Sequence, residues 1–126
     1  MTDLTQALES RFGPAADWPL KIRTAQAQLE TLQRYMGDDY TTYVRCARQA
    51  VDEHRAQAGV RTTLDRRERF GLLLHDVEST RGQESETIDV AWATNFGLEI
   101  LLNNEQYEQL IDAAVEANEP AVAGAR

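Results

Sequence analysis

Apolar residues recur at helical spacing through the first half of the chain. Between residues 19 and 36, and again between residues 40 and 58, they follow steps of three and four, the spacing of one helix face. Gly37 lies between the two stripes and suits a left-handed helix cap. We therefore expect two helices packed as an antiparallel αα-hairpin. A shorter apolar stripe before Gly13-Pro14 predicts a first helix, capped by Thr2 or Asp3.

In the second half the spacing changes to alternation. Between residues 86 and 94 every second side chain from Ile88 onward is apolar or threonine (Ile88, Val90, Trp92 and Thr94). In a strand these side chains would lie on one half-buried face. Residues 95–97 then suit a three-residue hairpin loop that ends in glycine, and a return strand over 98–103 would pair apolar with apolar side chains. A third strand at about 69–78 would complete a meander. A helix over residues 63–78 is the alternative, and we prefer the strand.

A last amphipathic helix is expected over residues 105–118, capped by Asn103 or Asn104 and ended by Pro120. The predicted fold class is therefore α+β. It has an N-terminal helix and the αα-hairpin, then an antiparallel β-meander of two or three strands and the C-terminal helix. At 126 residues the chain is of ordinary domain size. We expect one globular domain over 1–119 and a flexible tail over 120–126.

The two halves of the chain also differ in charge. Residues 1–75 hold 10 acidic and 11 basic side chains, whereas residues 76–126 hold 11 acidic side chains and only Arg81 and Arg126 as basic ones. The net charge of −8 therefore lies almost wholly in the second half. Surfaces that serve only solubility normally mix both signs. An acidic block of this kind suggests a basic partner.

Within the predicted last helix the carboxylates form a row about 21 Å long, and no Lys or Arg lies in that helix to pair with them. This acidic row consists of Glu105, Glu108, Asp112, Glu116 and Glu119. Its simplest interpretation is a solvated face. The functional interpretation is a non-catalytic protein-interaction protein that docks on a basic protein partner through the row. One form would be an inhibitor of a nucleic-acid-handling complex, of the phage counter-defence or immunity-protein type.

A cluster of arginines precedes the acidic block. It comprises Arg45, Arg48, Arg55, Arg61, Arg66, Arg67 and Arg69. Such a cluster could bind nucleic acid through its phosphates, but acidic residues are interleaved with it. We therefore favour pairing of these arginines with the acidic half inside the fold. A third hypothesis is a structural or assembly protein that forms a homodimer through the αα-hairpin.

The aromatic residues divide into expected core residues and expected anchors. Trp92 and Tyr40 are predicted to lie in the core. Tyr43, Trp18 and Phe96 are the aromatics to inspect for exposure, because exposed aromatic side chains often anchor interfaces.

Residues for catalysis are sparse. His54 falls on the hairpin seam, His75 has no gathered set of metal ligands around it, and Cys46 is eight residues from His54, too far for a thiolate–imidazole pair on one helix. We predict no enzymatic activity, no metal and no cofactor. One cysteine, no apolar leader and no membrane-length apolar run favour a cytoplasmic protein without a membrane partner.

Overall fold

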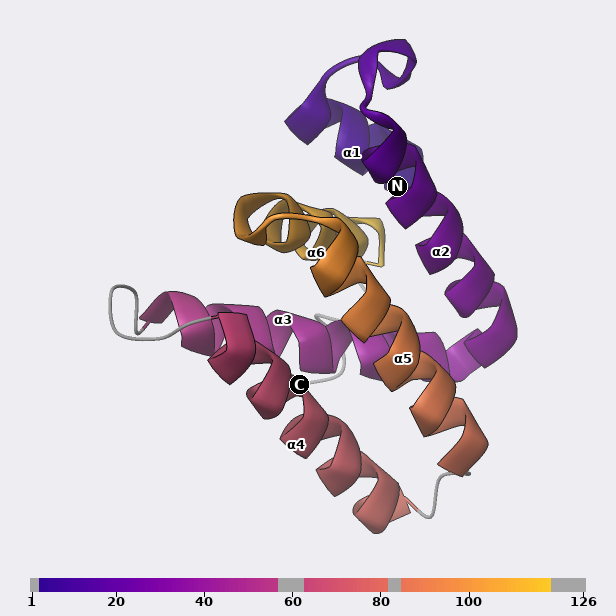
Figure 1. The fold of residues 1–126 in the computed structure, drawn as a ribbon. Helices are drawn as coiled ribbons and strands as arrows, with labels where there is room; N and C mark the ends of the chain where they lie inside the picture. The colour runs from indigo at the N-terminus through magenta and orange to yellow at the C-terminus, as the bar shows by residue number, and fades with distance from the viewer. Residues whose placement is uncertain (1–2, 57–62, 82–84, 119–126) are drawn as a thin grey trace.

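The computed structural model describes residues 3–56, 63–81 and 85–118, and every regular element in them is helical. In chain order these are α1 (Leu4–Phe12), the short 3-10 turn η1 (Ala15–Asp17), α2 (Leu20–Met36), the 3-10 turn η2 (Gly37–Asp39), α3 (Tyr40–Ala56), α4 (Thr63–Arg81), α5 (Ser85–Leu101) and α6 (Asn104–Ala117) (Figure 1). The predicted α+β fold is wrong, since these residues contain no strand. Residues 119–126, which include the whole of the predicted tail, lie outside the described residues.

The first and last helices begin as the sequence predicts. The Asp3 carboxylate accepts from the backbone N–H of Gln6, and the Asn103 side chain accepts from that of Gln106, each at 2.8 Å. In both cases the glutamine side chain accepts in return from the N-cap N–H, which completes a capping box. At the other end of α1, Gly13 adopts φ +83°, a left-handed backbone that glycine adopts without strain.

Both helices of the predicted hairpin exist, but they do not form a hairpin. α2 and α3 diverge from η2 (Figure 1), so that α2 packs mainly on α5 while α3 packs on α4 and α6. The reason lies in α3, where buried residues cover more than one narrow stripe. They are Tyr40, Thr42, Tyr43, Val44, Cys46, Ala47, Ala50 and Val51. A face this wide can accommodate two partner helices, and α4 and α6 occupy it.

The segments predicted as a meander form two helices, so that prediction is wrong. α4 covers the proposed third strand, and α5 runs without interruption through the proposed hairpin. Beside the buried Glu99, one buried stripe of this segment consists of Ile88, Ala91, Asn95, Leu98 and Leu102. Their steps of 3, 4, 3 and 4 are helical, but the polar Asn95 breaks the apolar pattern. Val90 and Trp92 lie off this stripe. The segment therefore has apolar residues both at helical spacing and at the two-residue spacing of a strand.

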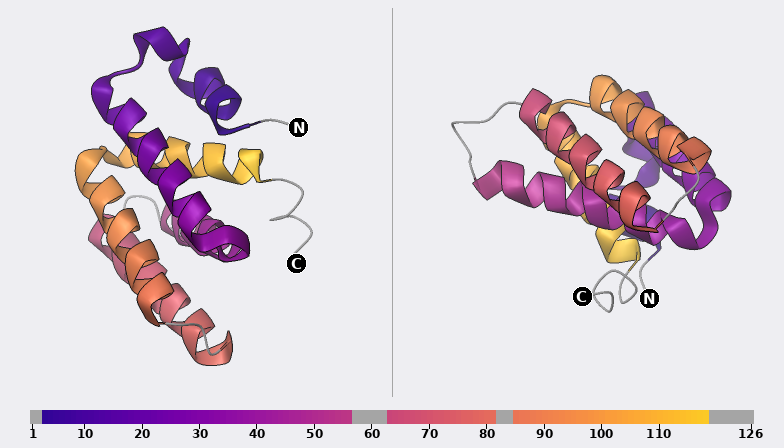
Figure 2. Two further views of the ribbon diagram at one scale, coloured as in Figure 1. Left: turned by 90° about the vertical axis from the view of Figure 1, so that its right-hand side faces the viewer. Right: turned by 90° about the horizontal axis from the view of Figure 1, so that it is seen from below.

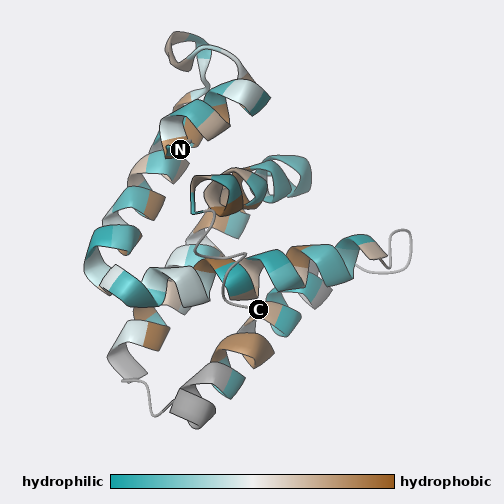
Figure 3. Cartoon of the chain, turned by 180° about the vertical axis from the view of Figure 1, so that it is seen from behind, coloured by the Kyte–Doolittle hydropathy of each residue, from teal (hydrophilic) through white to brown (hydrophobic). Residues whose placement is uncertain are grey.

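In space, α4 and α5 run antiparallel, and α6 turns away from α5 to lie across α3 and α1 (Figures 1 and 2). At the centre the Asn95 side-chain oxygen accepts from the hydroxyls of Tyr43 (3.0 Å) and Tyr107 (2.6 Å). All three residues are buried, so this contact joins α3, α5 and α6. Hydrophilic and hydrophobic segments alternate along α2 and α3 (Figure 3). None of the helices in the described residues has the length and apolarity to cross a membrane.

Candidate functional site

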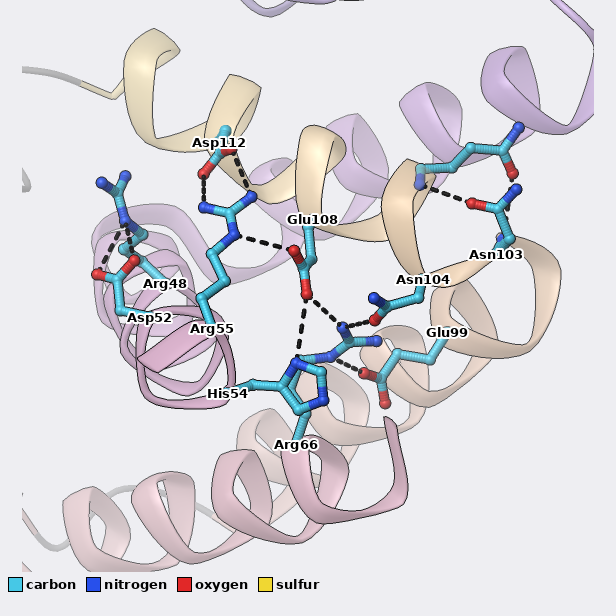
Figure 4. Close-up of polar contacts among 11 residues, drawn as sticks. Arg48, Asp52, His54, Arg55, Arg66, Glu99, Asn103, Asn104, Glu108 and Asp112 are labelled. Atoms are coloured by element: carbon cyan, nitrogen blue, oxygen red, sulfur yellow. Dashed lines mark hydrogen bonds and ion pairs between the residues drawn. The ribbon is translucent and has the colours of Figure 1, made fainter. Parts of the chain in front are cut away.

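The middle of the acidic row faces basic side chains of the same chain. Glu108 on α6 lies with one carboxylate oxygen 2.9 Å from Nε of Arg55. Its other oxygen lies 3.2 Å from a terminal nitrogen of Arg66 and 3.4 Å from Nδ1 of His54 (Figure 4). The Glu108 side chain is 13% exposed. This carboxylate therefore links α6 to both α3 and α4.

The next two carboxylates of the row are paired as well. Asp112 receives both terminal nitrogens of Arg55, at 2.9 and 3.3 Å, a two-point contact that fixes the guanidinium plane. These hydrogen bonds raise the pKa of Arg55 above its ordinary value. Glu116 lies 2.6 Å from Arg11 of α1. Glu105 is exposed, and Glu119 lies outside the described residues.

The most buried ion pair joins α4 to α5. Arg66 is 2% exposed, and its Nε donates to Glu99 at 2.8 Å. The same guanidinium donates to the Asn104 side chain and lies 4.3 Å from the ring centre of Tyr107. Burial raises the pKa of Glu99 above its usual range, although the neighbouring guanidiniums act in the opposite direction. Arg66 is therefore a core residue, placed where no nucleic acid can reach it.

Most of the remaining predicted cluster is also paired within the fold. Arg48 lies 3.0 Å from Asp52, Arg67 3.0 Å from Glu99, and Arg69 3.6 Å from Glu53. The Arg67–Glu99 contact is an ion pair without hydrogen-bond geometry. Among the described residues, Arg45 is exposed and makes no ion pair, and Arg61 lies outside them.

The groups that could perform chemistry are dispersed. Cys46 is buried, and burial raises the pKa of its thiol to about 11, so it is almost entirely protonated at neutral pH. His54 contacts Glu108 through Nδ1, and its Nε2 has no hydrogen-bond partner among the described residues. His75 is exposed on α4. In the part of the chain that the structure describes, no three metal-ligating side chains come together.

A second surface, absent from the sequence hypotheses, lies on the outer side of α5. Trp92, Phe96 and Ile100 are spaced one turn apart and are 47%, 38% and 63% exposed. We call these three residues the α5 outer face. The two rings stack with centroids 5.4 Å apart and an interplanar angle of 13°, and Arg67 lies 5.3 Å from the Phe96 ring centre. The expectation that Trp92 is a core residue is wrong.

The other aromatic predictions have mixed outcomes. Tyr40 is buried as expected, at 3% exposed, and Phe96 is exposed. Tyr43 and Trp18, which we had marked for inspection, are buried at 0% and 6% exposed. The Trp18 indole donates to the Gly13 carbonyl at 2.7 Å, so this ring closes the turn after α1.

Beside the α5 outer face runs a groove between α2 and α5, with a volume of about 680 Å³. Its walls are formed largely by small side chains, with Tyr35 at one end. They include Thr24, Ala27 and Thr31 of α2 and Ala93, Thr94 and Gly97 of α5. At Gly97 an added Cβ would find no atom within 4 Å. The signal that could have revealed this surface was a helix apolar all round with a glycine in its middle.

No family model, curated protein or solved structure matches the chain significantly.

Proposed function

We propose that this chain is a non-catalytic protein-interaction protein that binds another polypeptide through the α5 outer face and the adjoining α2–α5 groove. We call these two features together the binding face. The observation that carries the proposal is the α5 outer face, which leaves Trp92, Phe96 and Ile100 in solvent side by side. Contiguous exposed apolar patches often mark interaction sites. Aromatic residues are also the commonest anchors of protein interfaces.

The rings are already held in place before any partner arrives. Trp92 and Phe96 stack on each other, Arg67 lies over Phe96, and the indole nitrogen of Trp92 lies 3.4 Å from an ideal Cβ position at Gly71. Ordering side chains at an interface costs conformational entropy, and side chains that are already fixed reduce that cost. A preformed aromatic surface is what a binding role requires.

Docking on a basic partner through the acidic row stays a prediction, including its form as an inhibitor of a nucleic-acid-handling complex. It is now the less favoured one. Glu108, Asp112 and Glu116 each pair with an arginine of the same chain. A basic partner would have to displace those contacts, whereas Trp92, Phe96 and Ile100 are exposed among the described residues. Among the described residues of the row, Glu105 is exposed and makes no ion pair.

Nucleic-acid binding through the arginine cluster and dimerisation through a packed αα-hairpin are weaker alternatives. Arg48, Arg55, Arg66, Arg67 and Arg69 all pair with carboxylates, which leaves little positive surface for phosphates. The α2–α3 hairpin itself is not formed. A cytoplasmic location suits the proposal, because the single cysteine, Cys46, is a free thiol.

Quantitative capture from an extract of the native cell tests the proposal. Wild type is compared with Phe96→Ser/Ile100→Ser, with Leu72→Ser as the matched control, since Leu72 is 58% exposed on α4 and lies outside the binding face. We expect the double variant to lose at least about tenfold of the captured polypeptide, while Leu72→Ser and Glu105→Gln keep it. If Glu105→Gln removes capture and the α5 variant retains it, the acidic row is the docking surface instead.

A further inference from the structure

Two complementary shapes lie side by side on the binding face. The α5 outer face projects large side chains, and the α2–α5 groove beside it is walled mostly by small ones. A surface that carries both a ridge and a groove can pair with a copy of itself, because a two-fold axis places each ridge in the other copy's groove. The shape of the binding face therefore suits a second copy of the chain.

Gly97 supports close approach by another backbone or ring. Glycine within a helix costs about 1 kcal/mol relative to alanine, so its presence calls for a reason. The described residues give none, since a Cβ at Gly97 would meet no atom of theirs within 4 Å. The helix remains regular there, without a positive φ. What Gly97 keeps open is the floor of the groove.

The charges at the two ends of the binding face favour one relative direction of two docked copies. α2 and α5 run antiparallel (Figures 1 and 2), so Lys21 lies toward the Ile100 end of the groove and Asp89 marks the Val90 end. Near the Tyr35 end of α2, Arg34 and Asp38 carry opposite charges, so they add little net charge to that end. The face is therefore basic at one end and carries an exposed carboxylate at the other. Glu99, the other carboxylate of α5 in this stretch, is buried and ion-paired.

We propose, on the basis of the proposed function, that the polypeptide bound by this face is a second copy of the chain, docked antiparallel about a two-fold axis. The α5 outer face of each copy fills the α2–α5 groove of the other. Asp89 of each copy then approaches Lys21 of the other, twice per dimer. Parallel docking would set Asp89 against Asp89 and is disfavoured. The overall charge of −8 opposes self-association in general, and on the binding face that repulsion is small.

A charge exchange tests both the partner and the direction. In sedimentation equilibrium up to about 1 mM protein, wild type is expected to form a dimer. Asp89→Lys and Lys21→Asp should each raise the dissociation constant about fivefold, since two rim ion pairs become like-charge contacts. The double variant Lys21→Asp/Asp89→Lys should return to within about twofold of wild type.

Cross-linking supplies a direct readout of the same contact. Lys21 is the only lysine, and within one copy it is separated from Asp89 by most of the length of α5, about 16 Å. A zero-length carbodiimide should therefore join Lys21 to Asp89 between copies, and Lys21→Arg, which keeps the charge, should remove that product.

The outcomes separate this inference from the proposed function. A wild-type chain that stays monomeric overturns the second copy. So does a dimer that neither single charge variant weakens. If the chain is monomeric while capture of a different polypeptide still depends on Phe96 and Ile100, the proposed function stands and this inference fails. If no capture depends on those residues either, both fail.

Discussion

The α3–α4–α6 side and the α5–α2 side of this protein treat their exceptional residues in opposite ways. On the first side, carboxylates and guanidiniums pair with each other, and Arg66 of α4 extends this pairing to the buried Glu99 at the inner side of α5. On the second, Trp92, Phe96 and Ile100 face solvent. The charge that stands out in the sequence is largely used in holding the helices together. The less conspicuous apolar residues remain available for binding.

The two sides differ because charged and apolar side chains find partners in different ways. Charged groups on adjacent helices find partners within one chain, because side chains as long as arginine can reach across a helix interface. Among the described residues, Trp92, Phe96 and Ile100 instead remain exposed. A binding surface is thus better sought among exposed aromatics than among charges that already have partners.

The largest expected effect comes from breaking the buried pair on the charged side. Glu99→Ala should lower the free energy of unfolding by about 3 kcal/mol, because the buried Arg66 would keep only the Glu108 carboxylate, 3.2 Å away, as its counter-charge. Urea unfolding measures this. Asp52→Ala, which removes an exposed partner of Arg48, should cost at most about 0.5 kcal/mol. Equal costs for the two variants would contradict the division between buried and exposed pairs.

Next in size is the loss of the central acceptor. Asn95→Ala should cost about 2–4 kcal/mol, since the hydroxyls of Tyr43 and Tyr107 would be buried without a partner. In the Tyr43→Phe/Tyr107→Phe background the same substitution should cost much less, because those donors are already gone. An unchanged cost in that background would show that Asn95 acts through packing alone.

The buried thiol gives a prediction about pH. With its pKa raised to about 11, Cys46 should react with iodoacetamide about a hundredfold more slowly in the folded than in the unfolded chain at pH 8. Because the unfolded thiol ionises first, the folded state should also lose stability as the pH rises from about 9 toward 11. Cys46→Ala should remove that part of the pH dependence. Rapid alkylation of the native chain at pH 8 would be inconsistent with this burial.

The smallest effect is expected at the Arg11–Glu116 pair. Both side chains are partly exposed, at 23% and 39%, so Glu116→Gln should cost about 0.5 kcal/mol and less at high salt. Thermal unfolding at two salt concentrations measures it. A cost above about 2 kcal/mol would mean that this pair belongs with the buried ones.

Local patterns in the sequence were enough to predict α1, α2, α3 and α6. In the sequence each shows apolar residues repeated at helical spacing and a recognisable boundary, such as Gly13, Gly37 or Asn103. The same patterns could not show which helices pack together, because α3 buries a face wide enough for two partners. Partner choice is a property of the whole fold and is only weakly present in spacing.

α5 was misinterpreted because it has apolar residues on nearly every side. Its buried stripe contains a polar residue, Asn95, whose acceptor role depends on two tyrosines from other helices. The alternation that favours a strand runs through Ile88, Val90, Trp92 and Thr94, of which Ile88 is buried in the helix and Trp92 is exposed. Gly97 then resembled a turn residue, although it lies within the helix. For the candidate site, pairing of the arginines with the acidic half was foreseen, but the surface left open was not.

The central claim is that the binding face, with Gly97 at its floor, is the functional surface. One measurement tests it directly: the strength of polypeptide binding by wild type, Gly97→Ala and Gly97→Gln. The free energy of unfolding of each protein serves as the control. At Gly97 an added Cβ would meet no atom within 4 Å, so both variants should be at least as stable as wild type, by up to about 1 kcal/mol. Alanine should weaken binding slightly, because its Cβ takes space that Gly97 leaves open, and the longer glutamine side chain should fill the groove and weaken binding at least about tenfold. Full binding by a stable Gly97→Gln protein would contradict the account.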